Sequence, residues 1–294
     1  MKYRVQHTTV YHYADIVSMC HNEARLMPIN TYAQNCVSSK LIIEPSPADY
    51  RERNDFFGNK VSYFAIQQPH RNLTVTALSE VHTNIAQREL DKSEAIACKD
   101  VATHLRTQMD AESLDARQYV LNSPMVAADR ELEEYAQRSF ARNRPVIDAV
   151  YDLMERIHRD FVYDPGFTTL ATPLQEVLKH RRGVCQDFAH LAIGCIRSQG
   201  MAARYASGYI ETHPPPGQSK LIGADASHAW FSVYVPGLGW VDFDPTNNQM
   251  PMDKHITVAI GRDYADVTPL KGVIFGGGEH ELDVSVDITN LGNG

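Results

Sequence analysis

The chain has 294 residues, of which 43% are hydrophobic and 22% charged, a composition that argues against a disordered, collagen-like or disulfide-dense protein. Its net charge of −8 gives no reason to expect a nucleic-acid partner. Five cysteines are a sparse and odd set, which argues against a full disulfide framework and leaves at least one thiol free for chemistry.

Residues 1–88 are predicted to form a β-rich module. In Lys2–Tyr13, β-branched and aromatic residues recur at every second position, which is typical of a strand with one buried face. Three more strands are expected at Val37–Ile43, Val61–Ile66 and Leu73–Val81. Because turn-forming residues separate these short strands, the module should be an antiparallel sandwich or an open barrel. It carries no catalytic or metal-binding motif, so we expect it to be structural or to present substrate.

Residues 89–144 are predicted to be a helical linker region. A helix should begin there with Ser123 as its N-cap and Pro124 as its first residue. The apolar stripe of this helix would be Leu132, Tyr135, Ala136 and Phe140. A second helix, with its apolar stripe between Val146 and Phe161, begins the segment 145–294. Both stripes are expected to face the core.

Two further helices are predicted before residue 200. The first would begin with Thr172 as N-cap and Pro173 at the first helical position, with Gln175 completing a capping box. It would end at Gly183, and the next helix would begin almost at once and end at Gly200. The apolar stripe of that next helix consists of Phe188, Leu191, Ala192, Cys195 and Ile196.

Three strands are predicted after these helices, at Arg204–Ile210, His228–Val235 and Trp240–Phe243. The turn Pro236–Gly239 would join the last two strands into a hairpin. The segment Thr212–Ser219 is rich in proline and is expected to be a surface loop.

Cys185 is the cysteine whose position suggests chemistry. It follows the approach Arg181–Val184 and stands at the start of a predicted helix, where unpaired N–H groups and a partial positive charge favour a thiolate and could hold an oxyanion. Arg182 would strengthen the effect if it points toward the sulfur, and Gly183 would permit close approach of a substrate. The competing interpretation is an ordinary buried helix cysteine.

A histidine and an aspartate follow on the predicted hairpin. A thiol nucleophile needs an imidazole base, and the imidazole needs a carboxylate or amide to fix its tautomer. His228 and Asp244 would supply both groups if the register brings them to one face. A four-residue loop would place His228 opposite Asn247, whereas a three-residue loop would place it opposite Asp244. The sequence leaves both registers open.

Three ordered sequence blocks resemble the transglutaminase-like superfamily, whose members have a papain-like cysteine fold. The blocks are Gly183–Ala189, His228–Trp230 and Asp242–Thr246. Flanking segments that are also similar to the family are Phe161–Tyr163, Thr172–Leu178 and Arg197–Tyr209. The β-rich N-terminal module and the tail His255–Val267 resemble the bacterial subgroup. The resemblance spans nearly the whole chain and implies an α+β fold, in which a cysteine-bearing helix packs on an antiparallel sheet behind an all-β N-terminal domain.

The resemblance implies a Cys-His-Asp triad. Cys185 would be the nucleophile, His228 the general base and then acid, and Asp244 the residue that orients His228. Asp242 is the rival carboxylate, and Asp244 is preferred because it precedes Pro-Thr as in the family block.

The oxyanion hole would use the backbone N–H of Cys185 and one further donor, for which Tyr163 and Gln186 are candidates. Trp230 would either wall the site or pack in the core. The three triad residues are also conceivable zinc ligands, but the C-x-x-C or H-x-x-x-H pairs that usually accompany structural zinc are missing, so no metal and no cofactor is expected. Cys195 should be a core residue, and the spacing of the other cysteines indicates no role; these are Cys20, Cys36 and Cys98.

The predicted function is thiol-dependent acyl transfer on peptide or carboxamide carbonyls through a thioester acyl-enzyme. Water as acceptor would make the protein a cysteine protease or amidase, and an amine would make it a transglutaminase. The expected partner is a peptide or protein substrate, with an amine acceptor in the second case, and no nucleic acid or membrane. The sequence does not predict the oligomeric state.

Neither a signal peptide nor a membrane span is evident, which predicts a cytoplasmic location. The alternative function is a non-catalytic binding or scaffold protein that retains the fold. Its partner surfaces would then be the β-rich module and the loop at Pro214–Pro216.

Overall fold

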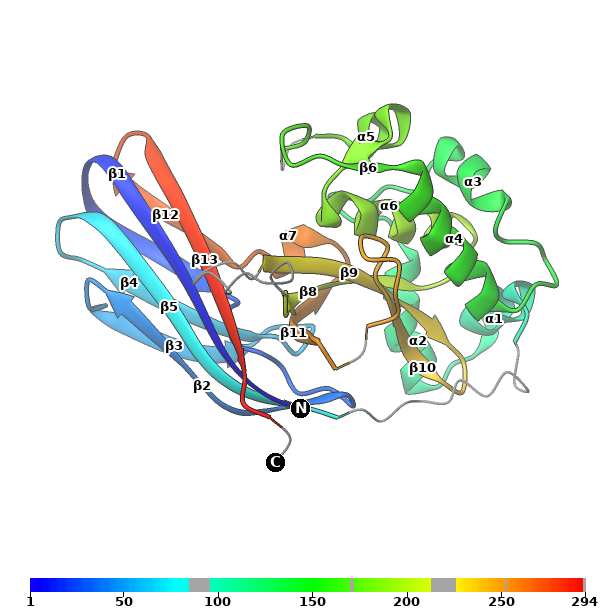
Figure 1. Cartoon of the computed structure of the whole chain (residues 1–294), viewed down its shortest axis with the longest axis horizontal. Coiled ribbons are helices and arrows are strands. Elements are labelled where there is room, and N and C mark those ends of the chain that lie inside the picture. The colour runs from blue at the N-terminus through cyan, green and yellow to red at the C-terminus, as the bar shows by residue number, and fades with distance from the viewer. Residues whose placement is uncertain (85–95, 170–171, 213–225, 252, 293–294) are drawn as a thin grey trace, which may run out of the picture.

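Two parts of the chain lie side by side, a β-structure formed by both ends of the sequence and a mixed helix-and-sheet part formed by its middle (Figure 1). The coordinates are a computed structural model, which describes residues 1–84, 96–169, 172–212, 226–251 and 253–292.

The N-terminal β-structure is built around one long strand. Strand β1 (Lys2–Ala24) pairs along most of its length with β5 (His70–Thr83) and through its last residues with β4 (Lys60–Ile66). β2 (Gln34–Glu44) pairs with β5, and β3 (Asp49–Asn54) pairs with β4. The strand order is therefore β2-β5-β1-β4-β3, all antiparallel.

The alternation predicted for the first strand is confirmed, because Tyr3, Val5 and Tyr13 are buried on one side of β1. The three other predicted strands lie within β2, β4 and β5. Strand β3 was not predicted, because all six of its residues are at least partly exposed and carry no apolar alternation.

The C-terminal tail returns to this β-structure. β12 (Leu270–Gly276) pairs with the last part of β1, and β13 (His280–Asn290) pairs with its first part. Each part of β1 therefore has a neighbouring strand on both edges, and a buried apolar cluster lies inside the fold that results. The domain boundaries at residues 88 and 144 stay predictions.

Helices dominate the chain between the β-structure and the second sheet. These are α1 (Cys98–Thr107), α2 (Ala111–Arg117), the 3-10 turn η2 (Gln118–Val120), α3 (Arg130–Gln137) and α4 (Val146–Asp160). Their apolar stripes face the core, as expected for amphipathic helices, and the described residues show no helix long and apolar enough to cross a membrane.

The predicted start of the helix after Ser123 is wrong. Helix α3 begins at Arg130, and its N-cap is Asp129, whose carboxylate accepts a hydrogen bond from the N–H of Leu132 at 2.9 Å. The Ser123 hydroxyl instead accepts a hydrogen bond from the guanidinium of Arg197, 2.9 Å away. A long-range contact therefore occupies the group that the local pattern assigned to capping.

The predicted ends of the next helix are also corrected. Helix α5 (Leu174–His180) has Pro173 at the N-cap position, and the hydroxyl of Thr172 accepts a hydrogen bond from the N–H of Thr169 instead of capping the helix. The helix ends at His180 because Arg181 adopts the left-handed conformation with φ of 55°.

A short pair of parallel strands leads into the next helix. β6 (Val162–Tyr163) pairs with β7 (Arg182–Gly183), and α6 (Cys185–Ser198) follows directly. The prediction of a helix that begins at Cys185 and ends before Gly200 is confirmed.

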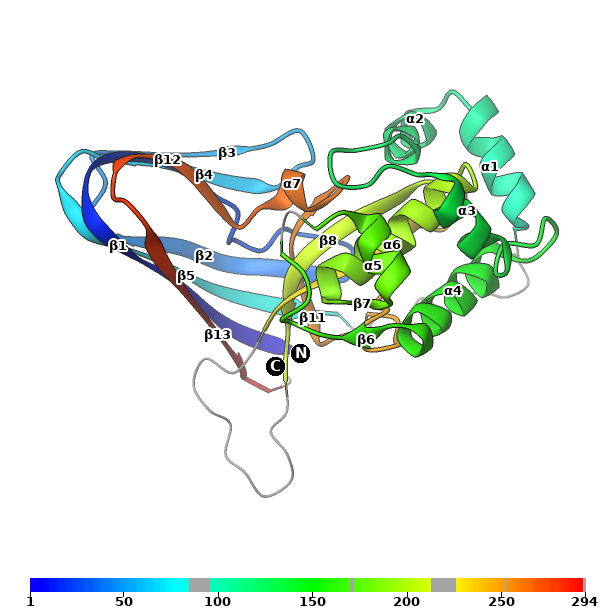
Figure 2. The same ribbon diagram turned by 90° about the horizontal axis from the view of Figure 1, so that it is seen from above.

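The second sheet is antiparallel and has four strands in the order β10-β9-β8-β11. They are β8 (Ala203–Ile210), β9 (Ala226–Val235), β10 (Gly239–Phe243) and β11 (His255–Gly261), followed by the short helix α7 (Tyr264–Val267). Helix α6 packs on β8 and β9, and α3, α4 and α5 pack around α6 (Figure 2). The predicted α+β fold, with a cysteine-bearing helix on an antiparallel sheet behind an all-β domain, is confirmed. Most of the predicted proline-rich loop, from 213 to 219, lies outside the described residues.

Two amides of the N-terminal region cover the free edge of β11. The side chain of Gln34 donates to the carbonyl of Thr257 (2.7 Å) and accepts from its N–H (2.8 Å). Asn59 does the same with Ile260, at 2.7 and 2.8 Å. These amides take the place of a neighbouring strand and join the two parts of the molecule.

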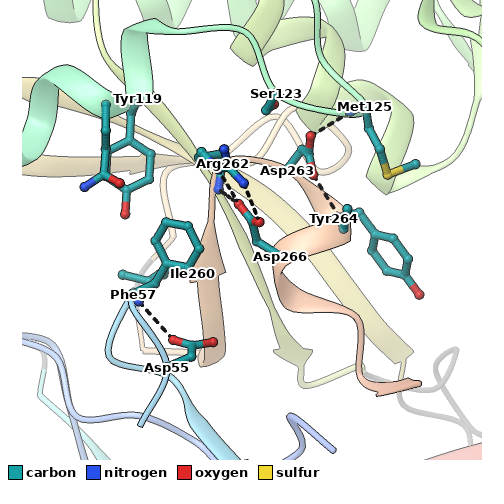
Figure 3. A network of polar contacts seen from close by, with 12 residues as sticks. Asp55, Phe57, Tyr119, Ser123, Met125, Ile260, Arg262, Asp263, Tyr264 and Asp266 are labelled. Carbon is teal, nitrogen blue, oxygen red and sulfur yellow. Dashed lines mark hydrogen bonds and ion pairs between the residues drawn. The ribbon is translucent and has the colours of Figure 1, made fainter. Parts of the chain in front are cut away.

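A polar network after β11 extends this junction (Figure 3). Arg262 forms a two-point ion pair with Asp266, both contacts at 2.9 Å, and its guanidinium lies over the ring of Phe57. Asp263 accepts hydrogen bonds from the backbone N–H of Met125 and of Ala265. The N-terminal region, the helical region and the second sheet are thus held together at one place.

Candidate active site

Asp187 fixes the beginning of helix α6. Its carboxylate accepts hydrogen bonds from the backbone N–H of Val184 (2.8 Å) and from the hydroxyl of Thr168 (2.7 Å). A Cβ on Gly183 would lie 2.7 Å from this carboxylate, so only glycine fits there. The absence of a side chain at Gly183 thus makes room for the Asp187 side chain of helix α6, and not for a substrate as the sequence suggested. Burial raises the pKa of Asp187, although the two hydrogen bonds oppose the change.

Cys185 is the first residue of α6 and is half-buried. The N–H groups of the first helical turn lack partners within the helix, so the sulfur stands at a positive helix end. Burial raises the pKa of the Tyr163 hydroxyl and a negative charge at Cys185 raises it further, which places this phenol near the sulfur. Arg182 is exposed and pairs with Asp164 at 3.5 Å. Its predicted contribution to the thiolate therefore has no support.

The hairpin adopts neither of the two registers considered from the sequence. Gly239 pairs with Val235, and the ladder continues to Phe243 opposite Phe231. Strand β10 then ends, and the turn that follows is closed by backbone hydrogen bonds between Asp244 and Gln249. Asp244 reaches His228 from this turn rather than from the opposite strand.

His228 lies between Asp244 and Cys185. Its Nε2 is 2.8 Å from Asp244 Oδ2, and the Cys185 thiol lies close enough to the ring to help raise the pKa of His228. Because Nε2 faces the carboxylate, Nδ1 is the nitrogen left for the sulfur. His228 and Asp244 are buried whereas Cys185 is partly exposed, so the site opens on the side of the sulfur. The structure thus brings together the three residues predicted as a triad.

The carboxylate of Asp244 accepts hydrogen bonds at both oxygens. Oδ1 faces the backbone N–H of Thr246 (3.0 Å) and of Asn247 (3.2 Å). Oδ2 faces the Asn247 side-chain amide (2.7 Å), Nε2 of His228 and Nε2 of His255 (3.0 Å). A fully buried carboxylate needs such a set of donors to remain ionised.

The charge state of the site follows from these contacts. Burial alone would lower the pKa of His228, but the interactions with Asp244 and Cys185 outweigh it and raise the pKa to about 10. Burial alone would raise the pKa of Asp244, but the hydrogen bonds from His228, His255 and Asn247 hold it well below its usual range. At neutral pH an imidazolium therefore lies between a carboxylate and the sulfur, the arrangement that stabilises a thiolate.

Asp242 and Trp230 have other surroundings. The Asp242 carboxylate accepts a hydrogen bond from the Ser232 hydroxyl on the neighbouring strand, so the rival carboxylate is not the one at His228. Trp230 is buried, with its ring 6.1 Å from that of His228, and therefore both packs in the core and backs the site.

Sequence reasoning missed Asn247 and His255 as members of this cluster. Asn247 entered only as a register position, although it lies one residue beyond the block Asp242–Thr246. His255 begins the tail segment that resembles the bacterial subgroup, but no role followed from that resemblance. The two conspicuous signals were a polar residue directly after a block and a histidine at the first position of an apolar strand.

His228, Asp244 and His255 each offer one ligand atom, and these atoms lie within 4.8 Å of one another, close enough to hold a metal ion. Metal binding would require both histidines to present an unprotonated nitrogen. Both Nε2 atoms instead lie at hydrogen-bond distance from Asp244 Oδ2, and the raised pKa of His228 keeps its proton in place. Hydrogen bonds therefore account for this arrangement.

Two cavities flank the cluster. One of about 250 Å³ lies beside the first turns of α6 and is lined by Gln186, Asp187 and His190 together with residues near Met125 and Leu174. The other, of about 720 Å³, lies between the second sheet and the N-terminal region, and its lining includes Trp230 and His255. The smaller cavity thus reaches the residues that directly follow Cys185 in α6, and the larger one reaches His255.

Two family models match the chain. The bacterial transglutaminase-like N-terminal region matches residues 3–82, and the transglutaminase-like superfamily core matches residues 133–245. The second match contains all three residues of the predicted triad.

Similar proteins extend these matches to the full length. An uncharacterized protein of Mycobacterium tuberculosis is 42% identical over 299 residues, which covers 98% of this chain and 92% of the relative. The protein-glutamine gamma-glutamyltransferase of Pseudomonas aeruginosa is 27% identical over 126 residues, covering 42% of this chain and 18% of that protein. A crystal structure from Cytophaga hutchinsonii, provisionally described as a cysteine protease, covers 100% of this chain and 92% of its own with a TM-score of 0.76 at 22% identity, and so has the same fold.

Proposed function

The chain belongs to the transglutaminase-like superfamily, and from this premise we propose that it is an enzyme of thiol-dependent acyl transfer on peptide or carboxamide carbonyls. Cys185 is the nucleophile, His228 the acid and base, and Asp244 the residue that orients His228. The proposed substrate is a peptide or protein that carries the reacting amide.

One observation supports this proposal above the others. A buried imidazole bonds a carboxylate through one nitrogen and lies near a thiol at a helix N-terminus, and both groups raise its pKa although burial alone would lower it. A histidine that served only as packing would be expected to have its pKa lowered by burial, as it is at His190. The contacts around His228 thus stabilise its protonated form next to the sulfur of Cys185.

The reaction follows from these positions. The Cys185 thiolate forms a bond to the carbonyl carbon, and the electron pair of the C=O bond moves to oxygen, where the N–H groups at the start of α6 stabilise it. The carbonyl re-forms, the C–N bond breaks, and the leaving amine takes the proton of the His228 imidazolium. A thioester on Cys185 remains.

The second half regenerates the enzyme. Neutral His228 removes a proton from the acceptor as it attacks the thioester carbon, and the C–S bond breaks to return the thiolate and the imidazolium. Water as acceptor releases a carboxylic acid, and a primary amine releases a new amide. The similarity to the glutamyltransferase from Pseudomonas aeruginosa is a reason to test an amine as the acceptor. The fold shared with the Cytophaga protein is a reason to test water as the acceptor.

The proposal is tested with wild type and Cys185→Ala on glutamine-containing peptides, with and without a primary amine. Ammonia release, peptide cleavage and the mass of an amine adduct are read in parallel, and the intact mass of the protein is searched for a thioester adduct. We expect turnover and an adduct with wild type, and a loss of at least about 10³-fold with Cys185→Ala.

The control is Cys36→Ala, because Cys36 is another half-buried thiol and lies in strand β2, outside the site. It should retain full activity. Turnover that survives Cys185→Ala would contradict the proposal, and absence of any turnover or adduct in wild type would favour the non-catalytic scaffold.

A further inference from the structure

A second histidine bonds the carboxylate of the predicted triad. His255, at the first position of β11, has its Nε2 3.0 Å from Asp244 Oδ2, the oxygen that also accepts from His228. The His255 side chain is buried, and its ring centroid lies 5.9 Å from that of His228. Asp244 is thus held by imidazoles from two different strands.

The bonding fixes the state of the His255 ring. A carboxylate can only accept hydrogen bonds, so the nitrogen that faces it carries the proton. Nε2 therefore donates to Asp244, and Nδ1 points away from the triad. Within the part of the chain that the structure describes, Nδ1 of His255 has no hydrogen-bond partner, so Asp244 is the polar contact that specifies this ring.

The position of His255 is rigid. Strand β11 pairs His255 with Ile210 of β8, and the edge of the ring packs against Trp230 at a centroid distance of 5.1 Å and an angle of 83°. Asp244 lies in the turn after the end of β10, where Thr246 and Asn247 of the same segment donate to its carboxylate. The hydrogen bond from His255 adds a donor from β11 and so ties this carboxylate to the second sheet.

We propose that His255 is a positioning residue for the reaction, which donates a hydrogen bond to Asp244 and so keeps this carboxylate ionised and aimed at His228. It acts through Asp244 and touches neither the substrate nor the sulfur. This role rests on the proposed function, but the charge state of Cys185 and His228 that it controls can be measured without a substrate.

Several charged groups surround His255 and bear on the pH dependence of the Cys185–His228 pair. Asp244 and His228 face it directly, Asp253 and Lys254 precede it in the chain, and Arg204 and Asp242 line the cavity that it also lines. Without the His255 donor, Asp244 would become easier to protonate and would support the His228 imidazolium less well. Because a thiolate is alkylated whether or not His228 is protonated, the acidic limb of the Cys185 alkylation profile should move to higher pH while its alkaline end stays unchanged. The alkaline limb of kcat, which needs the protonated His228, should move to lower pH.

The test compares His255→Phe, which keeps a ring but removes the donor, with His255→Gln, whose amide restores one. The control is His7→Phe, because His7 is also a buried histidine and lies in β1, outside the site. For each protein we would measure kcat and KM on the turnover substrate, the pH profile of Cys185 alkylation by iodoacetamide between pH 5 and 10, and the melting temperature.

We expect His255→Phe to lower kcat and the alkylation rate at neutral pH by about 10- to 100-fold, with KM nearly unchanged, as for the loss of one hydrogen bond to a charged group. His255→Gln should recover most of the loss, and His7→Phe should match wild type in rates and pH profile. An unchanged alkylation profile in folded His255→Phe, or a loss in His255→Gln equal to that in His255→Phe, would overturn the proposal.

Two features keep this test decisive. If wild type turns over no substrate, the proposed function fails, but the alkylation profiles still decide whether His255 controls the pair. If His255→Phe does not fold, nitrogen-15 NMR of histidine-labelled wild type, assigned with His255→Gln, reports the ring state directly. A proton on Nε2 of His255 at pH 7 supports the role, and an unprotonated Nε2 overturns it.

Discussion

The molecule has two buried polar clusters, one around Arg197 and one around Asp244, and only the second ends at a group that a substrate could reach. At the junction after β11, the guanidinium of Arg197 donates to the carbonyls of Tyr119, Ala203 and Arg262 and to the Ser123 hydroxyl, at 2.6 to 3.3 Å. At the other cluster, His228 and His255 share one carboxylate oxygen, and the ring of His228 faces a partly exposed thiol.

The difference separates a structural cluster from a chemical one. Arg197 is 3% exposed and its donors meet neutral acceptors within the fold, so although burial lowers the pKa of Arg197 to about 10, it stays charged and inert. The Asp244 cluster ends at the partly exposed thiol of Cys185. Burial and polarity are common to both clusters, and only the second offers a group to a substrate. Substitutions in the first should therefore change stability, and substitutions in the second should change chemistry.

The largest effect is expected at Asp244. Asp244→Asn should lower kcat by about 10²- to 10⁴-fold, because an amide can present its NH₂ to His228 and disturb the tautomer. The melting temperature reports any separate loss of stability. The matched variant is Asp242→Asn on the same segment, which should change kcat less than about threefold because Asp242 bonds Ser232 instead. Equal losses in both variants would contradict the assignment of the triad carboxylate.

Substitution of Arg197 should lower stability and leave the chemistry of Cys185 unchanged. Arg197→Met leaves the carbonyls of Tyr119, Ala203 and Arg262 without a donor, and we expect the free energy of unfolding to fall by about 3–5 kcal/mol in urea denaturation. The fraction that remains folded should alkylate Cys185 at the wild-type rate. Arg130→Met is the control, since Arg130 is exposed and its pair with Glu134 contributes less than about 1 kcal/mol. A changed alkylation rate in folded Arg197→Met would connect the two clusters.

A smaller effect is expected for the dependence of the free energy of unfolding on pH. Burial lowers the pKa of His7 and that of His190 from 6.5 to about 4, so between these values the unfolded chain binds protons that the folded chain does not. The free energy of unfolding should therefore fall as the pH drops from 6.5 to 4, by about 1–3 kcal/mol for each histidine.

The raised pKa of His228 has the opposite sign. Its contribution to stability is full below pH 6.5 and is lost as the pH rises toward 10. Urea denaturation at a series of pH values would check both the loss of stability toward acidic pH and the loss toward alkaline pH. The acidic slope should be smaller in His7→Phe, and an acidic slope identical to that of wild type would show that this histidine is not buried in its neutral form.

The sequence was sufficient for features set by local pattern. The alternation in Lys2–Tyr13 and the stripe from Phe188 to Ile196 lie where the structure has β1 and α6, because each depends on residues that are near in the chain. The resemblance supplied Cys185, His228 and Asp244, which the structure brings together.

Features decided by distant contacts could not be predicted in this way. Ser123 fits the local rules for an N-cap, but its hydroxyl accepts a hydrogen bond from Arg197, which lies 74 positions later in the chain. His255 is 11 residues from Asp244 and meets it because β11 begins beside the turn that follows β10. The hairpin register depended on which residues closed the turn, and no local pattern decided it.

The central claim, that Cys185 is an activated nucleophile, is tested most directly by its alkylation rate with iodoacetamide at pH 6, measured by mass spectrometry. Cys36 is the internal reference because it is also half-buried, whereas Cys20, Cys98 and Cys195 are buried and would react slowly for that reason alone. An ordinary thiol, with a pKa of about 8.5, is mostly protonated at this pH. We predict that Cys185 reacts at least about tenfold faster than Cys36, and equal rates in the folded protein would contradict the account.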